Sequence, residues 1–162
     1  MPALSATTRF FLPEVTNCVF VPTIAASTKI PTRAELTAGT TLTKEIADIS
    51  GWGVKSNMID TPDAGSRFVS QIGGRTNVDS SSITFYADIT GSDVRQTLPR
   101  NQTGYIVWMD GGDVPTQKMD IFPVQVTSVG KVRSLGDQAF QLTIDFAITG
   151  VPVEDVAIPA LT

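Results

Sequence analysis

Apolar and polar residues alternate through most of the chain between positions 49 and 149, and glycine-containing turns interrupt the alternation. Successive side chains of a β-strand point to opposite faces, so this pattern is typical of sheets that bury one face. The segment 139–148 shows the pattern most clearly. Its apolar residues are Phe140, Leu142, Ile144, Phe146 and Ile148, and its polar residues are Gln141, Thr143 and Asp145. The chain is therefore expected to fold as antiparallel sheet.

Roughly seven strands are expected, and turn residues set their limits. They cover residues 18–24, 51–59, 66–72, 82–88, 105–109, 118–134 and 139–148. Gly73-Gly74 is expected to end the third strand. The run 105–109 is apolar throughout, which indicates a strand covered on both faces.

The apolar phase shifts within the sixth of these strands. It runs through Met119 and Ile121, and then through Phe122, Val124 and Val126. Because strand side chains have a period of two, the shift predicts either a β-bulge near residues 121–123 or a change of the buried face.

Helix signals are few. Thr32 and Glu35 have the spacing of a capping box, which predicts one turn of helix or a loop that ends at Gly39. A second short helix is expected at 92–98, capped by Ser92 or Asp93. The fold class is therefore all-β, a β-sandwich or open barrel, with one short flanking α-helix.

The length of 162 residues suits a single domain spanning 1–162. Within it we expect an N-terminal arm at 1–17 and an extended C-terminal tail at 151–162.

The chain has few residues of the types that act in catalysis or bind metals, because it contains no histidine and only one cysteine. This excludes Ser-His-Asp and Cys-His catalysis and leaves no Cys/His cluster for zinc. Cys18 lies in an apolar run, where a buried thiol is expected. The aspartate pairs at 60/63 and 110/113 fit calcium in principle, but turn capping is the expected role. We predict no catalytic residue, no metal site and no cofactor.

Charge and hydropathy also limit the partners. Twelve Lys and Arg against sixteen Asp and Glu give a net charge of −4, and the basic stripe of a tight DNA binder is missing. Transient, non-specific passage of DNA is still compatible with this balance. No apolar stretch reaches the length of a membrane helix and no signal peptide is recognised, so we expect a soluble cytoplasmic product with no membrane partner.

The long strand pairs at 51–72 and 118–148 leave sheet edges that a small domain does not cover by itself. Edge-to-edge pairing with other copies of the chain would protect them. The sequence thus favours a building block over an enzyme.

Seven segments resemble the major tail (tail tube) proteins of long-tailed, non-contractile bacteriophages, and most closely those of actinobacterial phages. They are 31–36 (PTRAEL), 45–52 (EIADISGW), 60–63 (DTPD), 66–68 (SRF), 104–113 (GYIVWMDGGD), 118–124 (KMDIFPV) and 146–149 (FAIT). The likeness spans about residues 22–159, and its segments are structural rather than catalytic.

The resemblance implies a β-sandwich with a flanking helix, assembled into hexameric rings. Inner strands of the six subunits would close a barrel, and stacked rings would form the tube through which DNA is ejected. The implied partners are other copies of the chain, the tape measure protein, and the tail-tip and tail-terminator proteins. The implied location is the phage tail in the virion, after assembly in the cytoplasm of the bacterial host.

Two sets of residues are candidates for roles in such a tube. The first is predicted to line the lumen, where polar and acidic side chains let DNA slide without adhering; it consists of Gln125, Thr127, Gln141, Thr143 and Asp145. The second is the tip of the 51–72 hairpin, predicted to contact the adjacent ring; it consists of Asp60, Thr61, Pro62, Asp63, Ala64 and Gly65.

Two other functions remain open from the sequence. A monomeric carbohydrate-binding or adhesin-like sandwich would need an exposed aromatic platform, which Trp52 or Trp108 would supply. The other alternative is a head-decoration protein of the virion.

Overall fold

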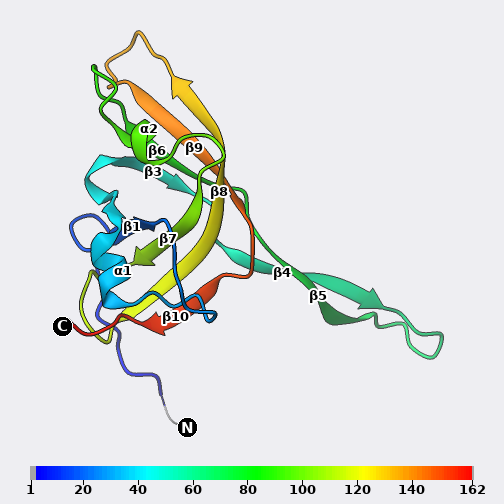
Figure 1. Cartoon of the computed structure of the whole chain (residues 1–162). Helices are drawn as coiled ribbons and strands as arrows, with labels where there is room; N and C mark the ends of the chain where they lie inside the picture. The colour runs from blue at the N-terminus through cyan, green and yellow to red at the C-terminus, as the bar shows by residue number, and fades with distance from the viewer. Residues whose placement is uncertain (1–2, 162) are drawn as a thin grey trace. The chain divides into compact units, whose positions relative to one another are not determined.

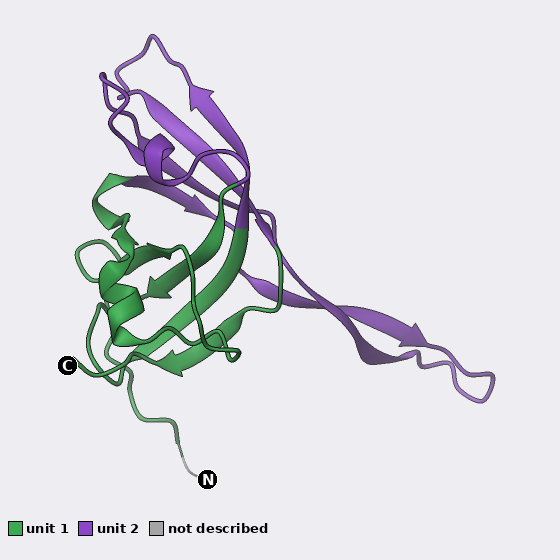
Figure 2. Ribbon diagram, in the orientation of Figure 1, with its two compact units in different colours: residues 1–45, 102–124, 149–162 green, residues 46–101, 125–148 purple. Residues whose placement is uncertain are grey.

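A computed structural model describes residues 3–161, which divide into two compact units. Unit 1 is drawn from residues 1–45, 102–124 and 149–162, and unit 2 from residues 46–101 and 125–148 (Figure 2). The described residues contain ten strands and two short α-helices (Figure 1). The all-β class expected from the sequence is confirmed. None of the helices between residues 3 and 161 has the length and hydropathy to cross a membrane.

Unit 1 is an antiparallel sheet with one helix. Its strands are β1 (Asn17–Val21), β2 (Thr40–Thr41), β7 (Thr103–Met109), the first part of β8 (Lys118–Val132) and β10 (Val153–Ala157). They are hydrogen-bonded in the order β2-β1-β7-β8, and β10 pairs with β8. All four residues from Ile106 to Met109 are buried, as the apolar run predicted for a strand covered on both faces.

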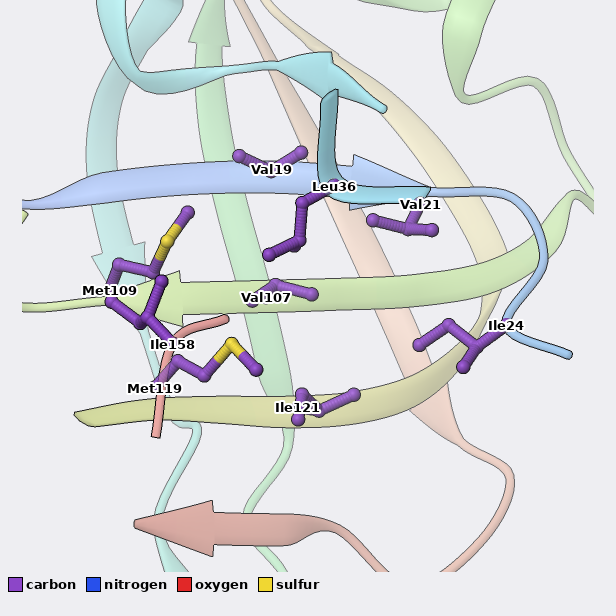
Figure 3. Close-up of a cluster of buried hydrophobic side chains, with 9 residues drawn as sticks. All are labelled: Val19, Val21, Ile24, Leu36, Val107, Met109, Met119, Ile121 and Ile158. Atoms are coloured by element: carbon purple, nitrogen blue, oxygen red, sulfur yellow. The ribbon is translucent and has the colours of Figure 1, made fainter. Parts of the chain in front are cut away.

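The core of unit 1 gathers apolar side chains from three strands, from helix α1 (Arg33–Ala38) and from two positions outside the strands (Figure 3). Leu36 is the residue through which the helix joins this cluster. The full set is Val19, Val21, Ile24, Leu36, Val107, Met109, Met119, Ile121 and Ile158. The alternate residues of β1, β7 and β8 meet here because they share one face of the sheet.

Helix α1 is short but well capped. The Glu35 amide donates to Thr32 Oγ1 at 3.3 Å, and the Thr32 amide donates to Glu35 Oε2 at 2.7 Å, which is the predicted capping box. The Ala25 amide donates to the other Glu35 carboxylate oxygen, and these backbone bonds hold the pKa of Glu35 below its usual value. Gly39 caps the other end, as expected.

Gly104 on β7 is in close contact with β1. An added Cβ atom at Gly104 would lie 2.4 Å from Phe20 Cε2 and 3.0 Å from the Val21 carbonyl oxygen. Phe20 is itself buried, so its ring has little room to move away. Only glycine fits this position without repacking.

We therefore expect Gly104→Ala to lower the free energy of unfolding by about 1–3 kcal/mol, the usual cost of overpacking. For a chain of this size that corresponds to roughly 2–4 °C in melting temperature per kcal/mol. Gly73→Ala is the matched control, because an added Cβ atom there has no neighbour within 4 Å. Thermal unfolding followed by circular dichroism separates the two. Equal melting temperatures for Gly104→Ala and wild type would contradict the packing argument.

Unit 2 contains four antiparallel strands in the order β8-β9-β6-β3. Its strands are the second part of β8, β9 (Gln141–Ile148), β6 (Ser81–Tyr86) and β3 (Ile46–Ser50). Ile83 pairs with Ile144 and Phe85 with Leu142, and all four side chains are fully buried. One face of this sheet is therefore apolar and covered.

The short helix α2 (Val94–Thr97) of unit 2 is the second predicted helix. Asp93 caps it by accepting from the Arg95 amide, and its carboxylate also pairs with the Arg95 guanidinium at 2.7 Å. This contact with Arg95 lowers the pKa of Asp93 to about 2.

A two-stranded hairpin, β4 (Val54–Thr61) and β5 (Ser70–Val78), completes unit 2. The prediction that Gly73-Gly74 ends a strand at 66–72 is wrong, because both glycines lie inside β5. Between the pairs Ser56↔Thr76 and Met58↔Gly73, one residue of β4 faces two of β5. The glycines therefore belong to a β-bulge region, where glycine is also favoured.

Other strand limits differ from the sequence expectation. Residues 51–53 lie outside any strand, and β3 precedes them where no strand was predicted. β8 is an unbroken strand of fifteen residues in which the four from Ile121 to Val124 are all buried. The apolar phase shift thus corresponds to a change of the buried face within one strand. Phe140 precedes β9 and is exposed, so it does not face the core as expected.

The segment 151–162 was expected to be extended, and it forms β10 within unit 1. Val153 pairs with Ile121, and Ile158 is buried in the core cluster. The described part of the N-terminal arm up to residue 16 has no helix or strand, and Leu4, Phe10 and Phe11 in it are exposed.

Candidate functional surfaces

Three of the four aspartates that fit calcium in principle form hydrogen bonds or ion pairs within the chain. Arg33 holds Asp113 in a bidentate ion pair, with nitrogen–oxygen distances of 2.5 and 2.6 Å. Asp60 accepts from the Gln71 amide nitrogen at 2.7 Å, and Asp63 accepts from the Gly65 amide at 2.8 Å. Among residues 3–161, no three Asp, Glu, His or Cys side chains are grouped as a metal ion requires.

Cys18 is fully buried in β1, as its apolar surroundings predicted. Burial raises the pKa of its thiol well above the usual value, so the group stays protonated at neutral pH. A protonated, inaccessible thiol is a poor nucleophile.

A recess of about 310 Å³ lies in unit 1, and its lining includes Phe10, Trp108, Asp110 and Asp120. Burial and the nearby Asp120 carboxylate raise the pKa of Asp110. The described residues around the recess offer carboxylates and one lysine but no hydroxyl or thiol nucleophile.

The polar face of unit 2 is the first candidate surface. Along β9, Gln141, Thr143 and Asp145 alternate with the buried residues of the same strand, as the sequence predicted. Directly opposite them on β6 lie Tyr86, Thr84 and Ser82. The hydroxyls of Thr84 and Thr143 are 3.0 Å apart, so these two side chains project from the same face.

The same face continues onto the edge strand β3. Ser50 pairs with Ser82, and Asp48 pairs with Thr84. Paired residues of antiparallel strands point to one side of the sheet, so β3 adds a hydroxyl and a second carboxylate. The lumen candidates chosen from the sequence omitted these β3 and β6 residues. The alternation at 82–86 was a signal for the β6 residues.

On β8, Thr127 and Gln125 were predicted to complete this face. Thr127 Oγ1 donates to the backbone carbonyl of Asp145 at 3.0 Å, which places Thr127 beside β9. Gln125 is half-buried. The hydroxyl that meets the Asp145 carboxylate is that of Ser128, which was not among the lumen candidates.

We use the name polar face for this surface. Its members are Asp48, Ser50, Ser82, Thr84, Tyr86, Gln141, Thr143 and Asp145, and Ser128 donates to the carboxylate of Asp145. The charged residues in this set are the carboxylates of Asp48 and Asp145. The surface is therefore hydroxyl-rich and mildly acidic.

The β3 edge of this sheet is open. In the part of the chain that the structure describes, β3 pairs with β6 on one side and has no strand on the other. β8 lies next to β9 on the other side of this sheet, and its residues 130–132 are exposed. Open edges of this kind carry unpaired backbone donors and acceptors and accept a further strand.

The hairpin tip is the second candidate surface. The structure places Asp60 and Thr61 at the end of β4, paired with Gln71 and Ser70, and the connecting loop covers 62–69. Thus four of the six predicted tip residues lie in the loop and two in the strand. Phe68, which is 77% exposed, and Val69 lie in the same loop, and the sequence prediction missed them.

The two tryptophans do not form an exposed platform of the kind a sugar-binding module would use. Trp108 is only 7% exposed within β7. Trp52 is half-buried, and its ring lies 5.4 Å from that of Phe146 between centroids. Both rings serve packing within their own units.

Comparison with known proteins identifies a family. The family model described as phage tail tube protein matches residues 7–161. No curated protein matches the sequence.

Solved structures with a similar fold have low sequence identity. A chain of the anti-feeding prophage baseplate, 6-fold symmetrised, is 13% identical with a TM-score of 0.54, covering 98% of this chain and 99% of that one. A chain of the extended sheath–tube complex of the PVC extracellular contractile injection system is 12% identical with a TM-score of 0.54, covering 94% and 100%. A chain of the native gene transfer agent virion is 15% identical with a TM-score of 0.50, covering 74% and 91%.

Proposed function

The chain belongs to the phage tail tube protein family, and we propose that its copies form stacked hexameric rings whose inner wall conducts DNA during ejection. Membership of this family makes it a structural protein of the virion. One observation carries the finer proposal. The four strands β8-β9-β6-β3 of unit 2 have one buried face, one polar face and an open edge at β3.

Edge-to-edge pairing of this sheet between subunits would cover the open β3 edge. In a ring, β3 of one subunit would meet the exposed end of β8, residues 130–132, in the next subunit, and closure would leave no unpaired strand. The 6-fold symmetry of the anti-feeding prophage baseplate, which contains a chain of similar fold, supports six subunits. The resemblance of the seven sequence segments supports a long, non-contractile tail.

The polar face would then line the channel. The channel wall would carry Gln125, Thr127, Gln141, Thr143 and Asp145, together with the residues of β3 and β6 that share one side of the sheet with the three β9 residues. Carboxylates repeated around and along the wall repel phosphate, while hydroxyls keep the wall wetted. DNA would pass without being held.

The tip of the β4–β5 hairpin, including Asp60, Thr61, Pro62, Asp63, Ala64 and Gly65, would contact the adjacent ring. Its exposed phenylalanine and valine give this contact apolar area to bury. The tape measure, tail-tip and tail-terminator proteins are further partners that the family implies. Assembly would take place in the bacterial cytoplasm, without catalytic turnover.

Negative-stain microscopy of the purified protein, with size-exclusion chromatography, tests the proposal. We expect rings or tubes of uniform diameter, unchanged by a chelator since no step uses a metal. A strictly monomeric protein at high concentration that binds oligosaccharides would instead favour the carbohydrate-binding alternative. Decoration of heads rather than tails in phage particles would favour the head protein.

A further inference from the structure

The hairpin of unit 2 joins its sheet through two adjacent crossings. The chain leaves β3 at Ser50, passes through residues 51–53 and enters β4 at Val54. It returns from β5 at Val78 and passes through residues 79–80 into β6. We call residues 51–53 and 79–81 the elbow.

Backbone contact at the elbow is unusually close. Gly51 has a φ of +84°, and a Cβ atom there would lie 2.2 Å from the carbonyl oxygen of Ser80. The Asp79 amide donates to the Gly53 carbonyl at 3.0 Å. The two crossings are therefore pressed together, with no space for a side chain between them.

Trp52 adopts a left-handed backbone conformation, with a φ of +70°. For a bulky residue this conformation is rare and costs about 1–3 kcal/mol, so it persists only where surrounding contacts hold it. Strained residues of this kind are concentrated at functional sites.

The contacts that hold Trp52 are specific. Its amide donates to Ser81 Oγ at 3.2 Å, and that hydroxyl donates to the Asp79 carbonyl at 2.9 Å. Ser81 is only 3% exposed, so this bridge is buried. The indole Nε1 donates to the Ser82 carbonyl at 3.4 Å, and the ring packs against Phe146 on β9. Trp52 thus ties the start of the hairpin to two strands of the sheet.

The hairpin itself has no comparable support. Met58, Ile59 and Ile72 along it are exposed, and in Figure 1 β4 and β5 extend away from the other strands of unit 2. A two-stranded hairpin without a core is marginally stable and has no fixed direction of its own. The contacts that orient the hairpin must therefore lie at the elbow.

We infer that Trp52 is a positioning residue that sets the direction of the β4–β5 hairpin before a second copy of the chain binds it. This inference rests on the proposed contact between hairpin and adjacent ring, and it specifies how that contact is prepared. A hairpin that already has the bound orientation loses less conformational entropy on assembly than a hairpin that samples many orientations.

Distance measurements on the monomer test the inference without assembly. Spin labels at Gln71→Cys on β5 and Gln96→Cys on α2 report the arm direction, since both positions are exposed and Cys18 is buried. In otherwise wild-type protein we expect one narrow distance distribution. Trp52→Asn keeps a residue that tolerates the left-handed conformation but removes the ring, and we expect a distribution at least about twofold wider. Trp52→Phe keeps a ring against Phe146 and should remain narrow.

Tube formation by the unlabelled variants completes the test. We expect Trp52→Phe to assemble and Trp52→Asn to remain folded but form few tubes. If Trp52→Asn does not fold, Ser81→Ala removes the bridging hydroxyl instead. A narrow distribution in Trp52→Asn overturns the inference, and so does a wide distribution with normal tubes. Failure of the wild type to form rings or tubes would count against the proposed function, while leaving the monomer measurement valid.

Discussion

A hairpin shortened at its tip should give folded subunits that do not form tubes. The change replaces residues 62–69 with Asn-Gly, so that a two-residue turn joins Thr61 to Ser70. These two residues already face each other at the end of the ladder, and a two-residue turn of this sequence suits antiparallel strands. Every backbone pair of β4 and β5 is kept, so we expect the subunit to keep its fold.

The expected loss of tubes follows from what the loop exposes. Phe68 is 77% exposed and Val69 is 45% exposed in the subunit, and the neighbouring Arg67 adds a charge. Removing this area takes away the proposed contact with the adjacent ring but leaves the sheet edges of unit 2 intact. Single rings are therefore expected to persist while stacking fails.

The control for the shortened hairpin is Ala64→Ser, a small polar change at an exposed tip position. Circular dichroism melts and negative-stain images of both variants give the answer. Tubes of normal length from the shortened variant would show that the loop is only a connector. Loss of rings as well as tubes would mean that the hairpin also takes part in closure of the ring.

Local sequence signals predicted several elements correctly, because the interactions behind them lie within a few residues. The Thr32–Glu35 capping box is one, since both partners lie in the same turn. The alternation in 141–148 is another, since a strand with one buried face repeats every two residues. Its apolar and polar faces both appeared as expected.

The sequence failed where a distant strand decides the outcome. Gly73-Gly74 is compatible with a turn or with a bulge, and the pairing partner Met58 decides between them. Trp52 was assigned to a strand from its apolar neighbours, but contacts with Ser81 and Phe146 hold it outside. A single sequence does not reveal such partners.

The candidate surfaces, like the strands, were predicted only in part from the sequence. The polar residues of β9 were found, but their partners on β6 are distant in sequence, as the separation of 59 positions between Thr84 and Thr143 illustrates. Ser128 was missed because its hydroxyl became relevant only through Asp145 across the strand pair. Alternation shows which residues share a face of one strand, but strand pairing determines the whole surface.

The lumen assignment predicts that Asp145→Lys will assemble into tails that eject DNA slowly. Asp145 is exposed on the polar face, and the substitution changes the wall by two charges in every subunit. Lysine pairs with phosphate, so DNA that should slide past would be held at many points along the tube. Asp145→Asn changes one charge while keeping the shape, and an intermediate delay is expected.

Salt dependence distinguishes this electrostatic effect from a structural defect. Exposed charges act over about 10 Å at 0.1 M salt and over shorter distances as salt rises, so the Asp145→Lys delay should shrink with added salt. Asp137→Lys is the matched control, because it makes the same charge change in the exposed loop before β9. Ejection triggered from purified particles, timed by the fluorescence of a dye that binds released DNA, measures both variants. Equal ejection times for Asp145→Lys, Asp137→Lys and wild type would mean that the polar face points away from the channel. A delay that does not change with salt would mean that the substitution acts by distorting the wall rather than by attracting the DNA.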